Sequence, residues 1–392
     1  MITRFGSLFA GHVDLDDHGL AATPVNDRWL PNERLLTVFD KSTRIAQLMD
    51  RRGYDVFWLA EHHFQREGYE VIPNILMLAV HLAHLTERIK FGCGFNIAPM
   101  WHPLRLAEDY AVADYLTGGR VVFGVGRGYH TREVETFGAP MLNPDANREL
   151  FEEQIDIIFK AFNEAAFSHS GKYYTLPPRV PYRGYELSDL TLVPRPTKLP
   201  VECYQPIVSA SPRGLEFMAR HGIKGVIGGG AAGGGAAAKT VIAWQEAQAR
   251  HGRHMPLGAD LVVGIMFHIA DSEEQAIEEA RPYFQEWMKM FAPLGFVPGL
   301  SEEQVRALAD PRLAPRADLP SLEDAVRGGA WFVGPPQRLV ERLQELQERF
   351  PGLEEVHVGQ VVGTDEHVIL EQLDRFATDV MPAFKRATAA VS

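Results

Sequence analysis

Short apolar runs alternate along the chain with longer segments in which apolar residues recur at helical spacing. Runs of this length are typical of buried parallel strands, and the longer segments are typical of amphipathic helices. The pattern predicts strands at about 3–10, 55–61, 89–97, 120–126, 201–209, 223–228, 260–270 and 354–362. It predicts helices at about 33–52, 72–85, 103–116, 146–165, 212–221, 236–251, 272–290, 335–349 and 365–385.

Eight strands with intervening helices predict an α/β fold, a (β/α)8 TIM barrel that forms a single domain over residues 1–392. A doubly wound open sheet fits the alternation nearly as well. The absence of a GxGxxG motif after the first predicted strand weighs against a Rossmann domain. We therefore expect the barrel.

Two regions interrupt the alternation. Residues 166–200 are rich in proline, glycine and tyrosine, which excludes a helix and predicts an irregular insertion with a short hairpin. Residues 291–330 form a second insertion, and long ordered loops in compact domains are commonly lids or binding loops. The glycine-rich run 228–235 follows a predicted strand, so we expect it at the mouth of the barrel.

The most informative polar residues are Glu61, His62 and His63, which directly follow the apolar run that begins at Asp55. In α/β barrels the chemistry lies at the carboxyl ends of the strands. Histidine changes charge near neutral pH, so both are candidate proton-transfer groups. Neighbouring residues of an extended chain point to opposite faces, so at most one of His62 and His63 should point into the mouth.

Three further strand ends carry candidate ligand-binding residues. Arg127 lies within Gly126-Arg127-Gly128, where glycines allow close approach and the guanidinium can bind phosphate or carboxylate, although a tight turn with a surface arginine fits equally well. Ser211 opens a predicted helix whose N–H groups could bind phosphate, although capping alone explains it. Residues 95–103 could form the floor of a site for an aromatic cofactor, or they could only start a helix.

Composition excludes several classes of partner and site. The formal charge of 39 − 51 = −12 argues against a nucleic-acid or acidic-membrane partner. Cys93 and Cys203 form no CxxC pair and no zinc-type cluster, so we expect no disulfide scaffold and no metal site. The start of the chain resembles no signal peptide, and no apolar run approaches 18 residues. We expect a cytoplasmic enzyme.

Taken in order, these segments resemble the bacterial luciferase-like flavin-dependent monooxygenases. The resemblance is densest over residues 53–165. There it rests on Gly53-Tyr54-Asp55, Glu61-His62-His63-Phe64, His102-Pro103-Leu104-Arg105-Leu106-Ala107-Glu108-Asp109, Gly119-Arg120, Phe123-Gly124, Arg127-Gly128 and Phe137-Gly138. It resumes weakly at 209–222, 333–336 and 379–384.

The resemblance implies a TIM barrel that binds reduced FMN (FMNH2) and activates O2 as a flavin C4a-hydroperoxide. It implies that His62 is the active-site histidine and that Glu133 orients it or stabilises its charge. It further implies that Arg127 and Ser211 hold the FMN phosphate, and that a non-prolyl cis peptide links Gly94 to Phe95 beneath the flavin. The expected cofactor-binding residues are Glu61, Gly94, Phe95, Asn96, Arg127, Gly128, Ser209 and Ser211.

Some positions depart from the luciferase pattern. Ala210 stands where luciferases carry a glutamate, and Gly126 stands where they carry a cysteine. The glycine-rich run at 228–235 is also unlike luciferases. We therefore infer no light emission.

The expected activity is oxygenation of a small, fairly apolar organic substrate with FMNH2 from a separate NAD(P)H:flavin reductase, because no NAD-binding motif is present. By analogy we expect a homodimer that packs helices near 72–85 and 103–116. Two alternatives stay open. One is a hydride-transfer oxidoreductase of the same superfamily that uses a deazaflavin. The other is a flavin-binding protein without oxygenase activity, against which intact His62 and Arg127 argue.

Overall fold

Eight parallel strands close into a barrel in the order β10-β11-β12-β14-β1-β2-β3-β5, and β5 pairs back to β10. The structure is a computed structural model that describes residues 1–228, 235–297 and 299–389. The barrel strands are β1 Arg4–Phe9, β2 Val56–Leu59, β3 Lys90–Cys93, β5 Val121–Gly126, β10 Cys203–Pro206, β11 Lys224–Ile227, β12 Leu261–Ile269 and β14 Glu355–Gly359. Each lies within one predicted strand, and the predicted TIM barrel is confirmed.

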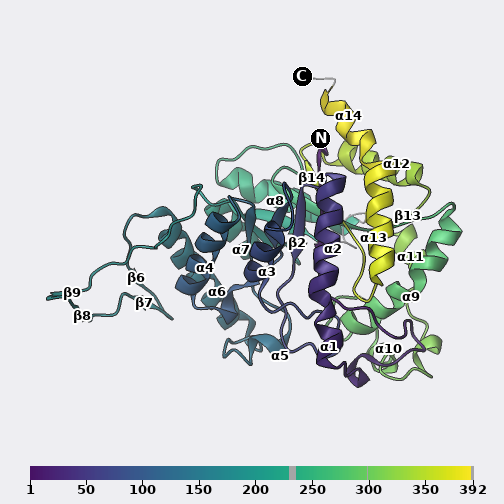
Figure 1. Ribbon diagram of the computed structural model, residues 1–392, viewed down its shortest axis with the longest axis horizontal. Helices are drawn as coiled ribbons and strands as arrows, with labels where there is room; N and C mark the ends of the chain where they lie inside the picture. The colour runs from purple at the N-terminus through teal and green to yellow at the C-terminus, as the bar shows by residue number, and fades with distance from the viewer. Residues whose placement is uncertain (229–234, 298, 390–392) are drawn as a thin grey trace.

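Helices surround the barrel, and α2 and α13 lie side by side against it (Figure 1). The longer helices are α2 Thr37–Arg52, α3 Ile75–Ala83, α4 Pro103–Leu116, α6 Pro144–Asn163, α7 Pro212–His221, α8 Gly235–Arg250, α9 Glu273–Phe291, α12 Pro336–Arg349, α13 Glu366–Arg375 and α14 Pro382–Ala389. The short α1 (Asn32–Leu35) and α5 (Thr131–Val134) lie at the end of the barrel where the strands finish. Within the described residues, no helix is both long and apolar enough to cross a membrane.

The alternation of side chains along β2 shows why the strands are apolar on both faces. Phe57 and Leu59 pack outward in the large core beneath the helices, while Val56 and Trp58 belong to a cluster inside the barrel. A Cβ atom at Gly92 would lie 2.3 Å from the Trp58 ring, so the neighbouring strand must carry glycine there. Burial on both faces is the physical reason for the continuous apolar runs that predicted the strands.

One strand of the sheet lies outside the predicted set. β13 (Trp331–Gly334) pairs with the second half of β12, from Met266 to Ile269, whereas β14 pairs with its first half. β12 is nine residues long and extends past β14, so its far end has room for a second neighbour. A four-residue run between glycines has too little periodicity to separate from a loop.

The insertion at 291–330 is mostly packed structure. It contains α10 Glu302–Ala307, a 3-10 turn at Ala314–Arg316 and α11 Leu322–Arg327. Leu308, Ala314 and Leu322 join Phe284 and Met288 of α9 in a second hydrophobic cluster. Among its described residues only Phe291 and Phe296 line the large cavity described below, so only the start of this segment can act as the expected lid.

The insertion at 166–200 forms two hairpins, which agrees with the expected irregular segment. The hairpins are β6 His169–Ser170 with β7 Thr175–Leu176, and β8 Pro181–Tyr182 with β9 Tyr185–Glu186. Figure 1 shows β8 and β9 projecting away from the barrel. Most of the glycine-rich run predicted to lie at the mouth, residues 229–234, is outside the described residues.

A buried charge network fixes α9 against the barrel mouth. The carboxylate of Glu286 accepts hydrogen bonds from Arg28 at 3.1 Å, from the Gly19 amide at 3.0 Å and from Tyr69, and it pairs with Lys289 at 3.0 Å. The side chain of Glu286 is fully buried. The network ties α9 to the loop between β1 and α1.

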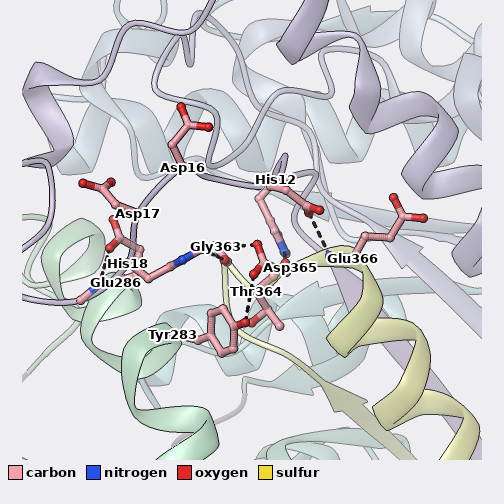
Figure 2. Close-up of polar contacts among 12 residues, drawn as sticks. His12, Asp16, Asp17, His18, Tyr283, Glu286, Gly363, Thr364, Asp365 and Glu366 are labelled. Atoms are coloured by element: carbon pink, nitrogen blue, oxygen red, sulfur yellow. Dashed lines mark hydrogen bonds and ion pairs between the residues drawn. The ribbon is translucent and has the colours of Figure 1, made fainter.

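The same loop also contacts the segment that follows β14 (Figure 2). His18 Nε2 lies 2.9 Å from the Gly363 carbonyl, and His12 Nε2 lies 3.0 Å from the Thr364 carbonyl. Tyr283 of α9 donates to Asp365 at 3.1 Å. Three segments that are distant in sequence are thus joined beside the mouth, and α9 is oriented with Trp287 and Phe291 toward the cavity.

Replacement of Glu286 by alanine should destabilise the fold. It would leave Arg28 and Lys289 buried without their shared carboxylate, which costs about 3–5 kcal/mol when one partner of a buried ion pair is removed. Glu302→Ala is the matched control, because Glu302 pairs with Arg306 at a surface site and its side chain is 91% exposed. We expect about 0–1 kcal/mol for the control in urea unfolding. Equal midpoints for the two variants would contradict the structural role of Glu286.

Candidate active site

A cavity of about 490 Å³ opens at the carboxyl ends of the strands. Its walls come from the ends of β1, β2, β5, β10, β12 and β14, together with α7 and α9. Arg127 and Arg148 lie near one another and form a cationic part of its lining, whereas Trp287, Phe291 and Phe296 form an apolar part. A concave, mainly apolar pocket with few convergent polar groups is typical of a ligand site.

His62 lies in this cavity directly beyond β2, and its side chain is buried. Its backbone N–H donates to the Ile72 carbonyl at 3.0 Å, which fixes the extended segment after the strand. Its Nδ1 lies 3.3 Å from both carboxylate oxygens of Glu133, so the two expected catalytic residues are brought together. Gln65 also donates to Glu133 at 2.9 Å and holds that carboxylate in place.

The other ring nitrogen of His62 belongs to a second hydrogen-bonded group that the sequence interpretation missed. Tyr129 Oη lies 3.2 Å from His62 Nε2 and donates to Glu70 at 2.7 Å. His130 Nε2 lies 2.9 Å from the other oxygen of Glu70. Tyr129 and His130 follow Arg127-Gly128 directly, so their place beyond β5 was a usable signal. Glu70 lies in a loop with no pattern of its own.

Both nitrogens of His62 face hydrogen-bond acceptors, and this arrangement favours the imidazolium. Burial by itself lowers the pKa of His62, but the carboxylates of Glu70 and Glu133 outweigh it and raise the pKa above its ordinary value. Burial likewise raises the pKa of Glu133, but the hydrogen bond and charge of His62 leave it lowered. Burial and then Glu70 raise the pKa of the Tyr129 phenol well above its usual range, so Tyr129 stays protonated.

His62, Glu70 and His130 each bring one ligand atom within 4.8 Å of the others. Two histidines and one carboxylate form a set that a transition metal can use. The hydrogen bonds that link these residues with Tyr129 account for the same spacing. The network therefore has a physical explanation as a set of proton donors and acceptors.

The cationic part of the cavity is suited to an anion. Burial lowers the pKa of Arg127 below its ordinary value, and the charge of Arg148 lowers it further, while the carboxylate of Glu152 opposes them. Glu152 itself pairs with Arg213 at 2.7 Å and with Arg148 at 4.0 Å. The hydrogen bond described for Arg127 goes to the neutral amide of Asn147 at 3.3 Å. Ser211 caps α7 through the Gly214 N–H at 3.3 Å, as predicted. The start of this ten-residue helix adds a favourable field for phosphate.

The floor of the cavity contains the expected backbone feature, because the Gly94–Phe95 peptide bond is cis. A Cβ atom at Gly124 would lie 1.9 Å from the Cys93 carbonyl oxygen, so glycine is required beside this bond. Gly94, Phe95 and Gly126 all line the cavity. This floor leaves space for a flat ring system.

The remaining expected cofactor-binding residues lie in different places. Ser209 and Gly128 line the cavity. Glu61 also borders it, but its carboxylate accepts from the Ile97 amide at 2.7 Å and from Trp101 at 2.8 Å and thus holds the neighbouring loop. Asn96 is fully buried, donates to the Gly124 carbonyl at 3.0 Å and is not among the lining residues.

Two histidines of the sequence patterns have structural contacts. His63 is directed to Glu61, with Nε2 3.1 Å from the carboxylate, so only His62 of the pair points to the cavity, as expected. His102 caps α4 by accepting from the Leu104 amide at 3.3 Å. The segment after β3 therefore both starts a helix and supplies the cavity floor.

The profile of the luciferase-like monooxygenase family matches residues 4–351. The chain therefore belongs to this family, which confirms the resemblance and the predicted enzyme class.

Two relatives illustrate the range of similarity. Over 142 residues the chain is 34% identical to protein y4vJ of Sinorhizobium fredii (strain NBRC 101917 / NGR234), which covers 36% of this chain and 39% of that protein. It is 25% identical over 359 residues to the oxygenase component of a flavin-dependent trigonelline monooxygenase of Acinetobacter baylyi (strain ATCC 33305 / BD413 / ADP1). The second match covers 89% of this chain and 91% of the relative.

Solved structures share the fold at low sequence identity. The oxygenating constituent of 3,6-diketocamphane monooxygenase from Pseudomonas putida, in complex with FMN, is 20% identical with a TM-score of 0.70, over 97% of this chain and 98% of that one. An F420-dependent secondary alcohol dehydrogenase is 14% identical with a TM-score of 0.63, over 98% and 99%. At these identities the likeness concerns the fold alone.

Replacement of Glu133 by glutamine should lower the pKa of His62, measured by NMR titration of labelled histidine. Because the folded-state pKa of His62 is raised, its charge contributes stability that is complete below the unfolded value of about 6.5 and is lost as pH rises through the folded pKa. Without Glu133 the folded pKa is lower, so the contribution of His62 is smaller and its loss is complete at a lower pH. Glu303→Gln, at an exposed position, is the control. An unchanged pKa of His62 would show that Glu133 does not stabilise the imidazolium.

Proposed function

We propose that the chain is the oxygenase component of a two-component system that uses reduced FMN and O2 to oxygenate a small, fairly apolar organic molecule. One observation carries the proposal: a single cavity is lined by two arginines, by a buried histidine held by carboxylates, and by an apolar group of aromatic side chains. Bound reduced flavin supplies the electrons that activate O2. The protein supplies binding, orientation and control of protons.

The flavin phosphate would lie at the cationic part of the cavity. Arg127 and Arg148 offer guanidinium groups, and the start of α7 offers backbone N–H groups beside Ser211. The ring system would lie along the floor that Gly94 and Phe95 form. Both features fit a flavin mononucleotide, whose charge is confined to one end.

His62 is the proposed proton donor at the reacting atoms, with Glu133 as its positioning residue. Tyr129 also lines the cavity and stays protonated, so it is a second hydrogen-bond donor there. A group of this kind typically contributes 10²- to 10⁴-fold to a rate. Exclusion of water by the apolar wall favours oxygen transfer over unproductive decay.

The substrate would lie against Trp287, Phe291 and Phe296. The rings of Phe291 and Phe296 pack edge to face with their centres 5.8 Å apart, and the ring centres of Tyr129 and Phe296 are 5.0 Å apart. Among the described lining residues, Arg127 and Arg148 are the only arginines or lysines. An anionic group on a substrate would therefore have no cationic partner beside these aromatic side chains. This supports a neutral, apolar substrate of about the size of one ring.

A separate flavin reductase would supply the reduced cofactor. The trigonelline enzyme of Acinetobacter baylyi is named as an oxygenase component, and it aligns with most of this chain. No NAD-binding motif was found in the sequence. Both points support delivery of FMNH2 from another protein.

Hydride transfer with a deazaflavin is the second candidate function, because an F420-dependent dehydrogenase shares the fold. The two functions differ in their need for O2. Product formed only aerobically, with FMNH2 and a mass gain of one oxygen, supports the monooxygenase. Product formed anaerobically with a reduced deazaflavin would overturn it, and stoichiometric H2O2 with every substrate tested would favour a flavin-binding protein without oxygenase activity.

Two variants separate chemistry from binding. His62→Ala should lower product formation roughly 100-fold or more while FMN still binds. Arg127→Met should weaken FMN binding roughly 10- to 100-fold, because a charged hydrogen bond contributes about 1.5–3 kcal/mol. Fluorescence titration of FMN and product yield measure the two effects. Unchanged yield in His62→Ala, or unchanged affinity in Arg127→Met, would contradict the assigned role.

A homodimer is proposed through α3 and α4. These helices contact one another and expose several large apolar side chains, namely Met77, Val112, Tyr115 and Leu116. Contiguous exposed apolar patches on a protein commonly mark surfaces that bind another protein. Sedimentation velocity should give twice the mass of the chain, and Tyr115→Arg should shift it to the monomer. A wild-type monomer at all concentrations would refute the dimer.

A further inference from the structure

Two polar residues on β14 connect the two ends of the barrel interior. Glu355 and His357 are two positions apart, so both point inward. His357 borders the large cavity, and Glu355 borders a second cavity of about 300 Å³ at the opposite, amino-terminal end of the strands. His357 Nε2 lies 2.9 Å from Glu355 Oε1, and both side chains are buried. The pair thus spans the barrel between its two cavities.

The second cavity gives Glu355 access to solvent. Its charged lining residues are Arg4, Asp55, Arg88, Lys90, Glu202 and Glu355. The side chains of Arg4 and Glu202 are 40% and 41% exposed, so this cavity reaches the surface. Its volume is ample for several water molecules, which need polar partners of this kind.

The surroundings of the pair are otherwise mainly apolar. The Trp58 ring packs on His357 at 5.1 Å between ring centres, and Val56, Val122 and Val262 fill the same part of the barrel. Tyr204 turns its hydroxyl away to Glu202, to which it donates at 2.9 Å. The barrel interior is therefore a packed apolar core in which the hydrogen-bonded pair of His357 and Glu355 is a polar connection between the two cavities.

We propose that Glu355 and His357 form a proton-transfer route between the active-site cavity and solvent at the amino-terminal end of the barrel. The inference rests on the proposed function. An oxygenation site must exclude water at its open end, yet protons must still be exchanged with solvent. A route through the barrel meets both requirements at once.

The transfer needs no further reactant. A proton from solvent binds the Glu355 carboxylate, passes to Nε2 of His357 to give the imidazolium, and leaves from the other ring nitrogen to a group in the cavity. Glu355 is then ionised again, and His357 is left neutral with its proton on Nε2. Rotation of the ring, or a proton that returns by the reverse steps, restores the tautomer that can accept the next proton from Glu355. Transfer in the opposite direction follows the same steps in reverse.

The charges around the pair suit this exchange. Burial by itself raises the pKa of Glu355, but His357 and then Arg4 outweigh it and hold the pKa below its ordinary value. Arg4 Nε lies 3.3 Å from the carboxylate, and Glu202 opposes it with a weaker effect of opposite sign. Glu355 is thus ionised at rest, with one carboxylate oxygen 2.9 Å from His357 Nε2.

The test is an NMR titration of labelled histidine in the protein with oxidised FMN bound, from pH 5 to 9, with His357→Asn used to assign the signal. His357 should titrate with bulk pH although FMN fills the cavity. Glu355→Gln should lower the midpoint by about one unit, a tenfold change in proton affinity. Glu354→Gln is the control, because Glu354 is the neighbouring residue and its side chain is 66% exposed.

Loss of the His357 titration when FMN binds, or an unchanged midpoint in Glu355→Gln, would overturn the route. The same comparison in the flavin-free protein keeps the two hypotheses apart. Failure of the wild-type protein to bind FMN contradicts the proposed function, whereas the midpoint in Glu355→Gln still decides whether the pair shares a proton.

Turnover gives a second measure. His357→Asn should lower kcat about tenfold at high pH, remove an inflection from the pH profile and leave KM and FMN affinity unchanged, because the route supplies protons and binds no substrate. A wild-type kcat and pH profile in a folded His357→Asn variant would refute the route. A role in packing alone would instead lower the melting temperature and leave the profile intact.

Discussion

The pairing of β5 with β10 is the constraint on which the active site depends. Cys203 and Tyr204 align with Phe123 and Gly124 and close the barrel. Closure brings Arg127, in the segment after β5, near Arg213 of α7, while Tyr129 of the same segment reaches His62 beyond β2. An open sheet would leave these strand ends in a row, and Arg127 and His62 would not line one cavity.

The cavity depends on a separation of charge within a low-dielectric interior. Arg127, Arg148 and Arg213 lie close to one another, and the carboxylates of Glu70 and Glu133 lie beside His62. The carboxylates raise the pKa of His62 and favour the imidazolium, whereas burial and the charge of Arg148 lower the pKa of Arg127. The formal charge of −12 for the whole chain indicates neither arrangement.

The apolar wall depends on a different kind of interaction. Glu286 and Lys289 of α9 are buried against the loop after β1, while Trp287 and Phe291 on the same helix face the cavity. A buried ionic contact has strict geometry, so it fixes the rotation of the helix as well as its position. The aromatic part of the cavity is therefore positioned by buried charged residues that do not line it. The insertion beyond α9 further stabilises the position of this helix, because its apolar side chains pack against Phe284 and Met288.

The sequence by itself determined the eight barrel strands, the helices between them, the expectation that at most one of His62 and His63 faces the mouth, and the capping role of Ser211. These features depend on side-chain periodicity and on neighbouring residues, which a single chain displays directly. Only the tertiary structure decided which residues are partners. Glu70 lies beside His62, Arg148 lies near Arg127, and β13 pairs with β12, although no local sequence pattern links the members of these pairs. The side chain of Asn96 binds the Gly124 carbonyl, and the carboxylate of Glu61 binds the Ile97 amide in the neighbouring loop. The sequence pattern does not show which buried backbone groups need such a partner.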